Sequence, residues 1–163
     1  MNLIVAVTAD WGIGCENRLL YRISEDMRRF KEMTIGKVVV MGHNTFKSLP
    51  DGLPLPERAN IMLSANPGLC IPGVTVCESV AKLHDVLESY ATEDVFVIGG
   101  ESVYVQLLNS CENAYITKIE RTPMADTFFP NLDELPGWWL AEESETKVSK
   151  TGIQFRFCEY VKI

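Results

Sequence analysis

Nearly continuous apolar runs of strand length alternate with segments of helical periodicity over most of the chain. Such runs are typical of strands that are covered on both faces of a parallel sheet. They span residues 3–9, 38–41, 60–63, 74–77 and 95–98. Apolar side chains at helical spacing occur in residues 25–33, 79–88 and 101–108, and a short helix is predicted to end at residue 48. This alternation predicts buried strands that are joined by crossover helices.

The pattern changes near the end of the chain. Residues 114–119 alternate as a strand, and residues 138–140 and 154–161 are typical of a closing antiparallel pair. Strands separated by helices early, followed by a strand pair late, predict an α/β fold. We therefore expect a central, mostly parallel, twisted sheet of about eight strands with an antiparallel C-terminal edge, flanked by about four helices. We expect a single domain over residues 1–163.

Local signals indicate where the helices begin. Ser24 and Ser79 are good N-cap residues before the first and third predicted helices, and either Asn44 or Thr45 can cap the short second one. A serine, threonine or asparagine side chain at this position accepts a hydrogen bond from a free backbone N–H of the first turn. The sequence therefore predicts side-chain caps at these three helix starts.

Composition and charge limit the kinds of partner. The chain has 163 residues, of which 47% are hydrophobic, enough for a sizeable core. No signal peptide and no apolar stretch of about 20 residues is apparent, so we expect a cytoplasmic protein. The net charge of −7 argues against nucleic acid or an anionic membrane as the main partner. Five scattered cysteines without a Cys-x-x-Cys pair predict free thiols, with neither a disulfide framework nor a metal site.

The charge is nevertheless unevenly distributed. Residues 1–60 carry eight Lys and Arg against seven Asp and Glu, whereas residues 61–163 carry seven against fifteen. An anionic ligand is therefore expected in the N-terminal third, although a solvated surface without a ligand explains the same asymmetry.

Asp26 is the first candidate for chemistry. It falls in the first turn of a predicted helix, four residues before Phe30, and directly after a loop containing Gly12 and Gly14, which take positive φ without steric cost. By spacing alone, an acid that complements the helix dipole is the better interpretation. The loop, the acid and the aromatic side chain together also fit the lid, acid and wall of a small-molecule cleft.

Glycines after two core strands are the second candidate. Gly42 and the pair Gly99-Gly100 each stand between a strand and a helix, where free backbone N–H groups can bind an anion. A plain turn between a strand and a helix explains both patterns equally well. Neither forms the Gly-x-Gly-x-x-Gly fingerprint of the ordinary dinucleotide fold.

Eight short segments, in order and at characteristic spacing, carry a resemblance over nearly the whole chain. They are Ile13-Gly14-x-Glu16-Asn17, Asp26 with Phe30-Lys31, Met41-Gly42 with Thr45-Phe46, Pro54-Leu55-Pro56-x-Arg58-x-Asn60-Ile61, Leu63-Ser64, Val97-Ile98-Gly99-Gly100, Tyr115-x-Thr117 and Asp126-Thr127-x-Phe129-Pro130. In these segments the chain resembles the dihydrofolate reductase family. The resemblance implies NADPH-dependent reduction of 7,8-dihydrofolate, with hydride transfer to C6 and protonation at N5.

The resemblance also implies roles for individual residues. Asp26 would accept hydrogen bonds from the pterin's N3–H and 2-amino group while a water carries the proton to N5, and Thr117 would support Asp26. Tyr21 stands where the family has a tryptophan and keeps a polar tip for a water. Arg58 would bind the α-carboxylate of the glutamate tail. The residues implied to line the folate pocket are Ile4, Val5, Ala6, Leu20, Met27, Phe30, Leu49 and Leu55.

The implied cofactor is NADPH. Its expected contacts are Ala6, Ile13, Gly14, Gly42, His43, Asn44, Thr45, Leu63, Ser64, Ala65, Ile98, Gly99, Gly100, Glu101, Ser102, Val103 and Tyr104, with a cis peptide between Gly99 and Gly100. Asp126 would hold the lid closed by accepting backbone N–H groups of the turn at residues 14–16. The chain departs from the family at Leu20-Tyr21, where a Pro-Trp pair is usual, and at His43, where an arginine commonly binds the 2′-phosphate. Glu101 would have to point away from a pyrophosphate.

Two alternatives remain open. An inactive homologue could keep the fold and the cofactor site, although it would have no need of Asp26, and a riboflavin-pathway reductase of similar fold would not need an acid in a pterin pocket. The expected partners are dihydrofolate and antifolate inhibitors, with no nucleic acid or membrane, and the expected state is a monomer.

Overall fold

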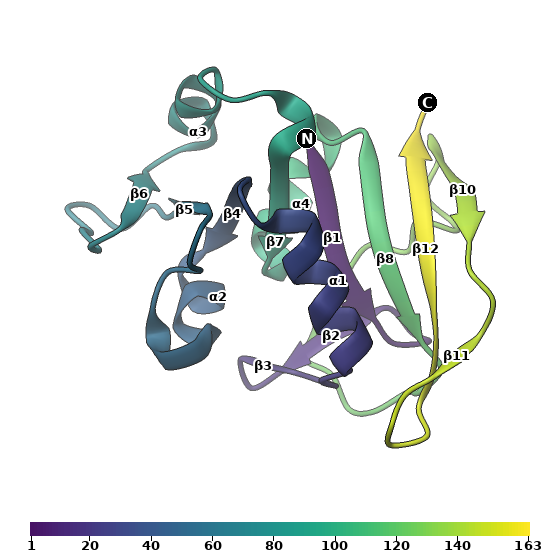
Figure 1. Ribbon diagram of the computed structural model, residues 1–163. Coiled ribbons are helices and arrows are strands. Elements are labelled where there is room, and N and C mark those ends of the chain that lie inside the picture. The colour runs from purple at the N-terminus through teal and green to yellow at the C-terminus, as the bar shows by residue number, and fades with distance from the viewer.

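A mixed sheet forms the centre of the computed structural model, which describes residues 1–163 (Figure 1). The strands of this sheet are β1 (Asn2–Val7), β4 (Val38–Gly42), β5 (Ala59–Leu63), β6 (Val74–Cys77), β7 (Val95–Gly99), β8 (Asn113–Ile119), β10 (Trp138–Glu143), β11 (Lys147–Val148) and β12 (Gln154–Lys162). Their order is β10-β12-β8-β1-β7-β4-β5-β6, with β11 paired to β12. Neighbouring strands from β8 to β6 are parallel, and β12 is antiparallel to both of its neighbours. The predicted fold class is confirmed.

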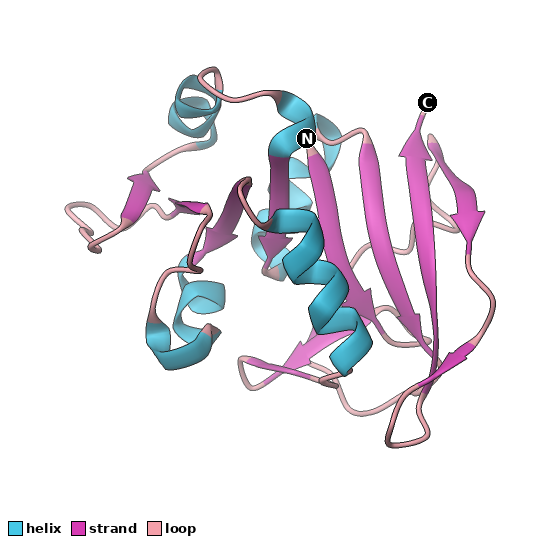
Figure 2. Ribbon diagram, viewed as in Figure 1, coloured by secondary structure: helices cyan, strands magenta, loops and turns pink.

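Four helices accompany the sheet, as Figure 2 shows: α1 (Ser24–Thr34), α2 (His43–Ser48), α3 (Val80–Leu87) and α4 (Glu101–Leu107). Successive side chains of a strand point to opposite faces, so each face of β1 has its own packing partners. Leu3 and Val7 pack in the largest core cluster with Val103 and Leu107 of α4, whereas Ala6 packs on the cluster that contains Ile23, next to α1. The sheet is therefore covered on both faces, which explains the nearly continuous apolar runs.

Side-chain capping is confirmed at α3 and wrong at the other two helices. Ser79 precedes α3, and its Oγ accepts a hydrogen bond from the N–H of Lys82 at 3.1 Å. Ser24, in contrast, is the first residue of α1 rather than its cap. The helix begins earlier because Ile23 is extended and 2% exposed, and its carbonyl oxygen already accepts the N–H of Met27 at 2.9 Å. Core packing of Ile23 therefore decides where the helix starts.

The second helix also begins earlier than predicted. Gly42, the last residue of β4, occupies the cap position of α2, so Asn44 and Thr45 lie inside the helix. The hydroxyl of Thr45 lies toward the Gly99–Gly100 turn, because Thr45 Oγ1 is 3.4 Å from where a Cβ would stand on either glycine.

The segment after β1 is a small sheet rather than an open loop. It contains β2 (Gly12–Cys15), β3 (Arg18–Leu19) and the distant β9 (Thr127–Phe128), in the order β3-β2-β9. Glu16 and Asn17 connect β2 to β3 with φ of +50° and +59°, as a two-residue hairpin turn with two positive φ angles requires. We call residues 11–20 the lid.

The role predicted for Gly12 and Gly14 is wrong, because neither has positive φ. A Cβ on Gly12 would stand 2.8 Å from Thr8 Oγ1, and one on Gly14 would stand 2.9 Å from Thr127 Oγ1. These glycines therefore allow the lid to approach its neighbours closely.

The remaining elements are short. Three 3₁₀ turns, η1 (Pro50–Gly52), η2 (Thr92–Asp94) and η3 (Leu108–Ser110), complete the chain. The segment Asp126–Pro130, predicted as a loop, contains β9, and β11 was not predicted at all. None of the helices has the length and apolar character needed to cross a membrane.

Candidate functional site

Asp26 and Thr117 form a hydrogen-bonded pair between α1 and the sheet. Thr117 Oγ1 donates to Asp26 Oδ1 at 2.5 Å, a length typical of a hydroxyl that donates to a carboxylate. Thr117 lies on β8 opposite Ala6 of β1, and it is 3% exposed. Asp26 lies in the first turn of α1 and is half-buried. The pairing of β1 with β8 therefore places a hydroxyl under this acid, 91 residues away in sequence.

The carboxyl of Asp26 is in an environment that opposes its ionisation. Burial raises its pKa above the usual range for aspartate, and the hydrogen bond from Thr117 and the charge of Arg29 partly offset this effect. Arg29 is itself fixed, because its guanidinium lies 4.4 Å from the ring centroid of Phe157 and 3.6 Å from Glu159 Oε1. Asp26 is thus half-buried, and the positive charge of Arg29 favours its ionised form. Its second oxygen, Oδ2, remains free for a ligand.

The apolar side chains predicted to line the pocket include members of two packing clusters. Leu49 and Leu55 pack with Ile98 on the cluster of Val39, Met41, Phe46 and Met62. Ala6 and Tyr21 pack together on the cluster of Ile23, Ile119 and Phe155. Met27 remains 39% exposed, and Ile4, Val5, Leu20 and Phe30 have little or partial exposure. The main-chain oxygen of Ile4 accepts a hydrogen bond from the hydroxyl of Tyr104 at 2.8 Å, which fixes this part of β1.

Arg58 lies at the other end of α1. Its Nη1 donates to Thr34 Oγ1 at 3.1 Å, and its Nε donates to the carbonyl of Pro56 at 3.0 Å. Thr34 is the last residue of α1, and eight residues of helix separate it from Asp26, a length of about 12 Å. Burial lowers the pKa of the Arg58 guanidinium from its usual value, with Glu57 opposing the change. The helix therefore separates an acid at one end from a cation at the other.

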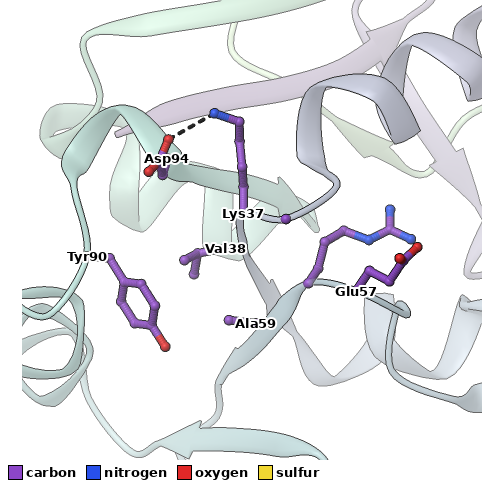
Figure 3. Close-up of a pocket in the computed structure, with 8 residues that line it drawn as sticks. Lys37, Val38, Glu57, Ala59, Tyr90 and Asp94 are labelled. Carbon is purple, nitrogen blue, oxygen red and sulfur yellow. Dashed lines mark hydrogen bonds and ion pairs between the residues drawn. The ribbon is translucent and has the colours of Figure 1, made fainter.

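Arg58 is one of the residues that line a pocket of about 420 Å³ (Figure 3). The figure shows Lys37 bonded to Asp94 at its rim, with Tyr90 and Glu57 on opposite sides. Its lining comes from residues at or just before the amino ends of β4, β5 and β7, whereas Gly42 and Gly99 lie at the carboxyl ends of β4 and β7. Neither Asp26 nor Thr117 lines this pocket. The positive charges of its Lys37 and Arg58 are balanced by the negative charges of Glu57 and Asp94. We therefore do not identify it with the catalytic site.

The glycine turns lie where the ends of two strands pack closely against α2 and α4. The carboxyl ends of the parallel strands β4 and β7 are adjacent, with Met41 opposite Gly99. The Gly99–Gly100 peptide is cis, as the resemblance implied, and Gly99 has a φ of +125°. A Cβ on Gly99 would stand 3.3 Å from the ring of Tyr104, and one on Gly42 would stand 3.0 Å from Val103. These glycines therefore allow Val103 and Tyr104 of α4 to pack on the strand ends, and they place the turn beside the hydroxyl of Thr45, a donor that suits a phosphate-bearing cofactor.

The other predicted cofactor contacts divide by exposure. Asn44, Ala65 and Ser102 are exposed, and Ile13, His43 and Ser64 are half-buried. Val103 and Tyr104 are 5% and 3% exposed, so their side chains belong to the core. Leu63, at 9%, is also buried. The structure thus brings the predicted residues to neighbouring strand ends without exposing every side chain.

Two acids hold β9, the strand beside the lid. Asp126 Oδ2 accepts the N–H of Glu16 at 2.9 Å, which is the hydrogen bond the resemblance implied. Glu101 does point away from the glycine turn, because its Oε2 accepts the N–H of Phe128 in β9. The main-chain N–H of Asp126 also donates to the carbonyl of Gly14 at 3.0 Å.

Sequence reasoning assigned no role to three supporting residues, although Asn60 belongs to a family motif. Thr34 holds Arg58, Asn60 accepts the N–H of Leu55 and donates to the carbonyls of Leu55 and Arg58, and Arg29 lies near Asp26. The spacing Asp26-x-x-Arg29 was a usable signal, since residues three apart share a helix face. Nothing in the sequence pairs Thr34 with Arg58, which is 24 residues away.

Comparisons with known proteins agree on one family. The family model described as dihydrofolate reductase matches residues 1–162. The dihydrofolate reductase of Neisseria gonorrhoeae is 35% identical over 162 residues, covering 99% of this chain and 97% of the relative. That of Bacillus subtilis is 33% identical over 162 residues, covering 99% and 94%.

A solved structure agrees in fold as well as in sequence. Dihydrofolate reductase from Enterococcus faecalis, complexed with NADP(H) and RAB-propyl, superposes with a TM-score of 0.87 at 32% identity, covering 99% of this chain and 95% of that one. The full-length matches and the shared architecture show that the chain belongs to the dihydrofolate reductase family.

Proposed function

We propose that the Asp26–Thr117 pair is the centre on which the dihydrofolate reductase activity of this chain depends. The family gives the activity: NADPH-dependent reduction of 7,8-dihydrofolate to tetrahydrofolate, with hydride transfer to C6 and a proton to N5. The observation that carries the proposal is the 2.5 Å hydrogen bond between Thr117 Oγ1 and the half-buried Asp26. An inactive homologue that kept only the cofactor site would have no use for a carboxylate kept in this environment.

Asp26 binds and orients the pterin. A carboxylate offers two oxygens, and the pterin's N3–H and 2-amino group present two adjacent donors, so a bidentate pair fits both partners. Thr117 occupies one lone pair of Oδ1 and so limits the rotation of the carboxyl group. The negative charge then favours a protonated N5, and a water delivers the proton because Asp26 lies too far from N5. The half-buried Tyr21 offers a hydroxyl that can position this water.

Arg58 sets the length of the substrate. Its guanidinium forms a planar fork that matches the α-carboxylate of a glutamate tail, and two of its N–H groups are already fixed to Thr34 and Pro56. Since α1 separates Asp26 from Arg58 by about 12 Å, a ligand must bring a donor edge and a carboxylate to opposite ends of the helix. A pterin joined through an aromatic linker to glutamate has this form, with Met27 and Phe30 of the same helix beside the linker.

NADPH, when bound, supplies the hydride. We assign its diphosphate and nicotinamide-ribose contacts to the cradle of Gly42, Thr45 and Gly99–Gly100, which lies at the adjacent carboxyl ends of β4 and β7 with the hydroxyl of Thr45 beside it. His43 and Ser64, both half-buried, are the groups assigned to the 2′-phosphate. The lid excludes water from the reacting atoms, and Asp126 holds it through Glu16.

We also propose that residues 1–163 act as one domain, as a monomer in the cytoplasm, and that antifolates compete with dihydrofolate for Asp26. The acidic net charge supports the absence of nucleic acid and anionic membrane partners.

The decisive test is the decrease of NADPH absorbance in the presence of dihydrofolate. Rapid oxidation that depends on dihydrofolate supports the proposal. Binding of both ligands without turnover would favour the inactive homologue, and turnover only with a riboflavin-pathway substrate would favour the related reductase. The matched variant Asp26→Asn keeps the shape of the side chain and should lose turnover while retaining NADPH binding.

A further inference from the structure

The lid strand partner β9 is held from two sides. On one side it pairs with β2, where the N–H of Asp126 donates to the carbonyl of Gly14 at 3.0 Å. On the other side the N–H of Phe128 points away from β2 and donates to the carboxylate of Glu101. Glu101 is thus the protein acceptor for an amide that the small sheet itself does not use.

Aromatic packing fixes the next residue of the chain to the same helix. The ring of Phe129 meets that of Tyr104 edge to face, with centroids 4.9 Å apart at 76°. Phe129 also stacks on Trp11 at the start of the lid, with centroids 6.3 Å apart. The segment that carries β9 therefore lies between α4 and the lid, and contacts both.

Glu101 lies at a position in the chain that connects its hydrogen bond with Phe128 to the cofactor turn. It is the first residue of α4 and follows Gly100 directly, so the carboxylate that holds β9 stands next to the cradle assigned to the cofactor. An acid in a first helical turn usually interacts with its own helix. Here the half-buried carboxylate instead accepts a hydrogen bond from a strand 27 residues away.

We infer that Glu101 is a positioning residue for hydride transfer. By holding the Phe128 amide it sets the distance of β9 from α4, and β9 in turn sets the lid through Asp126 and Gly14. This side-chain hydrogen bond therefore adds a polar connection between the cofactor turn and the lid to the aromatic contacts of Phe129. The inference rests on the proposed function, in which the lid closes over the reacting atoms.

The test compares Glu101→Ala with Glu101→Gln in single-turnover hydride transfer. Alanine removes the acceptor, and we expect hydride transfer to slow about five-fold while the dissociation constant of dihydrofolate changes less than about two-fold. Glutamine keeps an oxygen that can accept the same N–H, so its rate should stay within about two-fold of the parent. A parental rate in the alanine variant, or equal slowing in both variants, overturns the inference.

A measurement without substrate separates this inference from the proposed function. Hydrogen exchange of the Phe128 amide should be faster in Glu101→Ala and close to the parent in Glu101→Gln, and unchanged exchange in the alanine variant overturns the inference. Because Glu101 and Asp126 act on the same strand, the double alanine variant should be no slower than the slower single variant, and additive slowing would contradict a shared path. Glu142→Ala, which removes an exposed acid of β10, is the control and should leave both readouts unchanged. If the parent protein fails to reduce dihydrofolate, the proposed function is wrong, and amide exchange still decides whether Glu101 holds β9.

Discussion

Asp126→Ala isolates the side-chain contact between the lid and β9. The substitution removes the 2.9 Å hydrogen bond from the Glu16 N–H, while the main-chain bond from Asp126 N–H to Gly14 remains. A hydrogen bond to a charged acceptor contributes about 1.5 to 3 kcal/mol when buried, and this one is exposed, so the low end applies. A loss of about 1.4 kcal/mol from the closed state corresponds to about ten-fold slower hydride transfer. Single-turnover oxidation of bound NADPH measures this rate directly.

The controls make the result specific. Asp126→Asn keeps an oxygen that can accept the Glu16 N–H, so its rate should lie between those of the parent and the alanine variant. Asp85→Ala removes an exposed acid of α3, which lies away from the lid, and should leave the rate unchanged. The alanine variant should unfold at nearly the parental temperature, because β2 and β9 remain paired. An unchanged rate in a folded Asp126→Ala protein would refute the idea that this contact holds the lid closed.

Three further variants test the groups assigned to the ends of the substrate and to the cofactor. Asp26→Asn should lower hydride transfer at pH 7 by orders of magnitude with nearly intact NADPH binding, as single-turnover and binding assays can check. Burial raises the pKa of Asp26 in the folded state, so the parent protein loses stability as pH rises through that pKa, whereas Asp26→Asn does not. The melting temperature of Asp26→Asn should therefore exceed that of the parent at pH 8, and this difference should disappear in acid. Arg58→Lys should raise KM for dihydrofolate about ten-fold with a smaller change in kcat, because an ammonium cannot replace a bidentate fork, and equal KM values would contradict the assignment. His43→Arg should raise the ratio of NADH to NADPH dissociation constants, because an always-charged guanidinium fork binds a phosphate in a bidentate way, and a ratio indifferent to the substitution would mean that other groups bind the 2′-phosphate.

The strands that could be predicted are those whose burial is complete. Val38 to Met41 and Val95 to Val97 are covered on both faces, so their apolar runs carry the information locally. Strands β2, β3, β9 and β11 have two to four residues and no apolar pattern. β3 and β11 pair with strands that are close in sequence, β2 and β12, whereas β9 depends on a distant partner, because Thr127 lies opposite Gly14 of β2. The glycines of β2 were misinterpreted for the same reason, since their purpose is the close approach of Thr8 and Thr127 rather than a positive φ.

The same distinction between local and distant information decides how much of the site the sequence reveals. An acid three residues into a helix suits the helix dipole and a ligand equally well, and only the hydroxyl of Thr117, delivered by the β1–β8 pairing, separates the two interpretations. The resemblance to the family identified Asp26 and Thr117 through the motifs that contain them, even though no local spacing encodes their pairing. Glu101 illustrates the converse case. Its position in the motif implied only that its carboxylate must point away from the glycine turn. The direction in which it points depends on β9, a strand that no local pattern predicts. The roles that the sequence does not predict are therefore those of residues that connect one part of the site to another. The variants of Asp126 and Glu101 measure how much these connections contribute to hydride transfer.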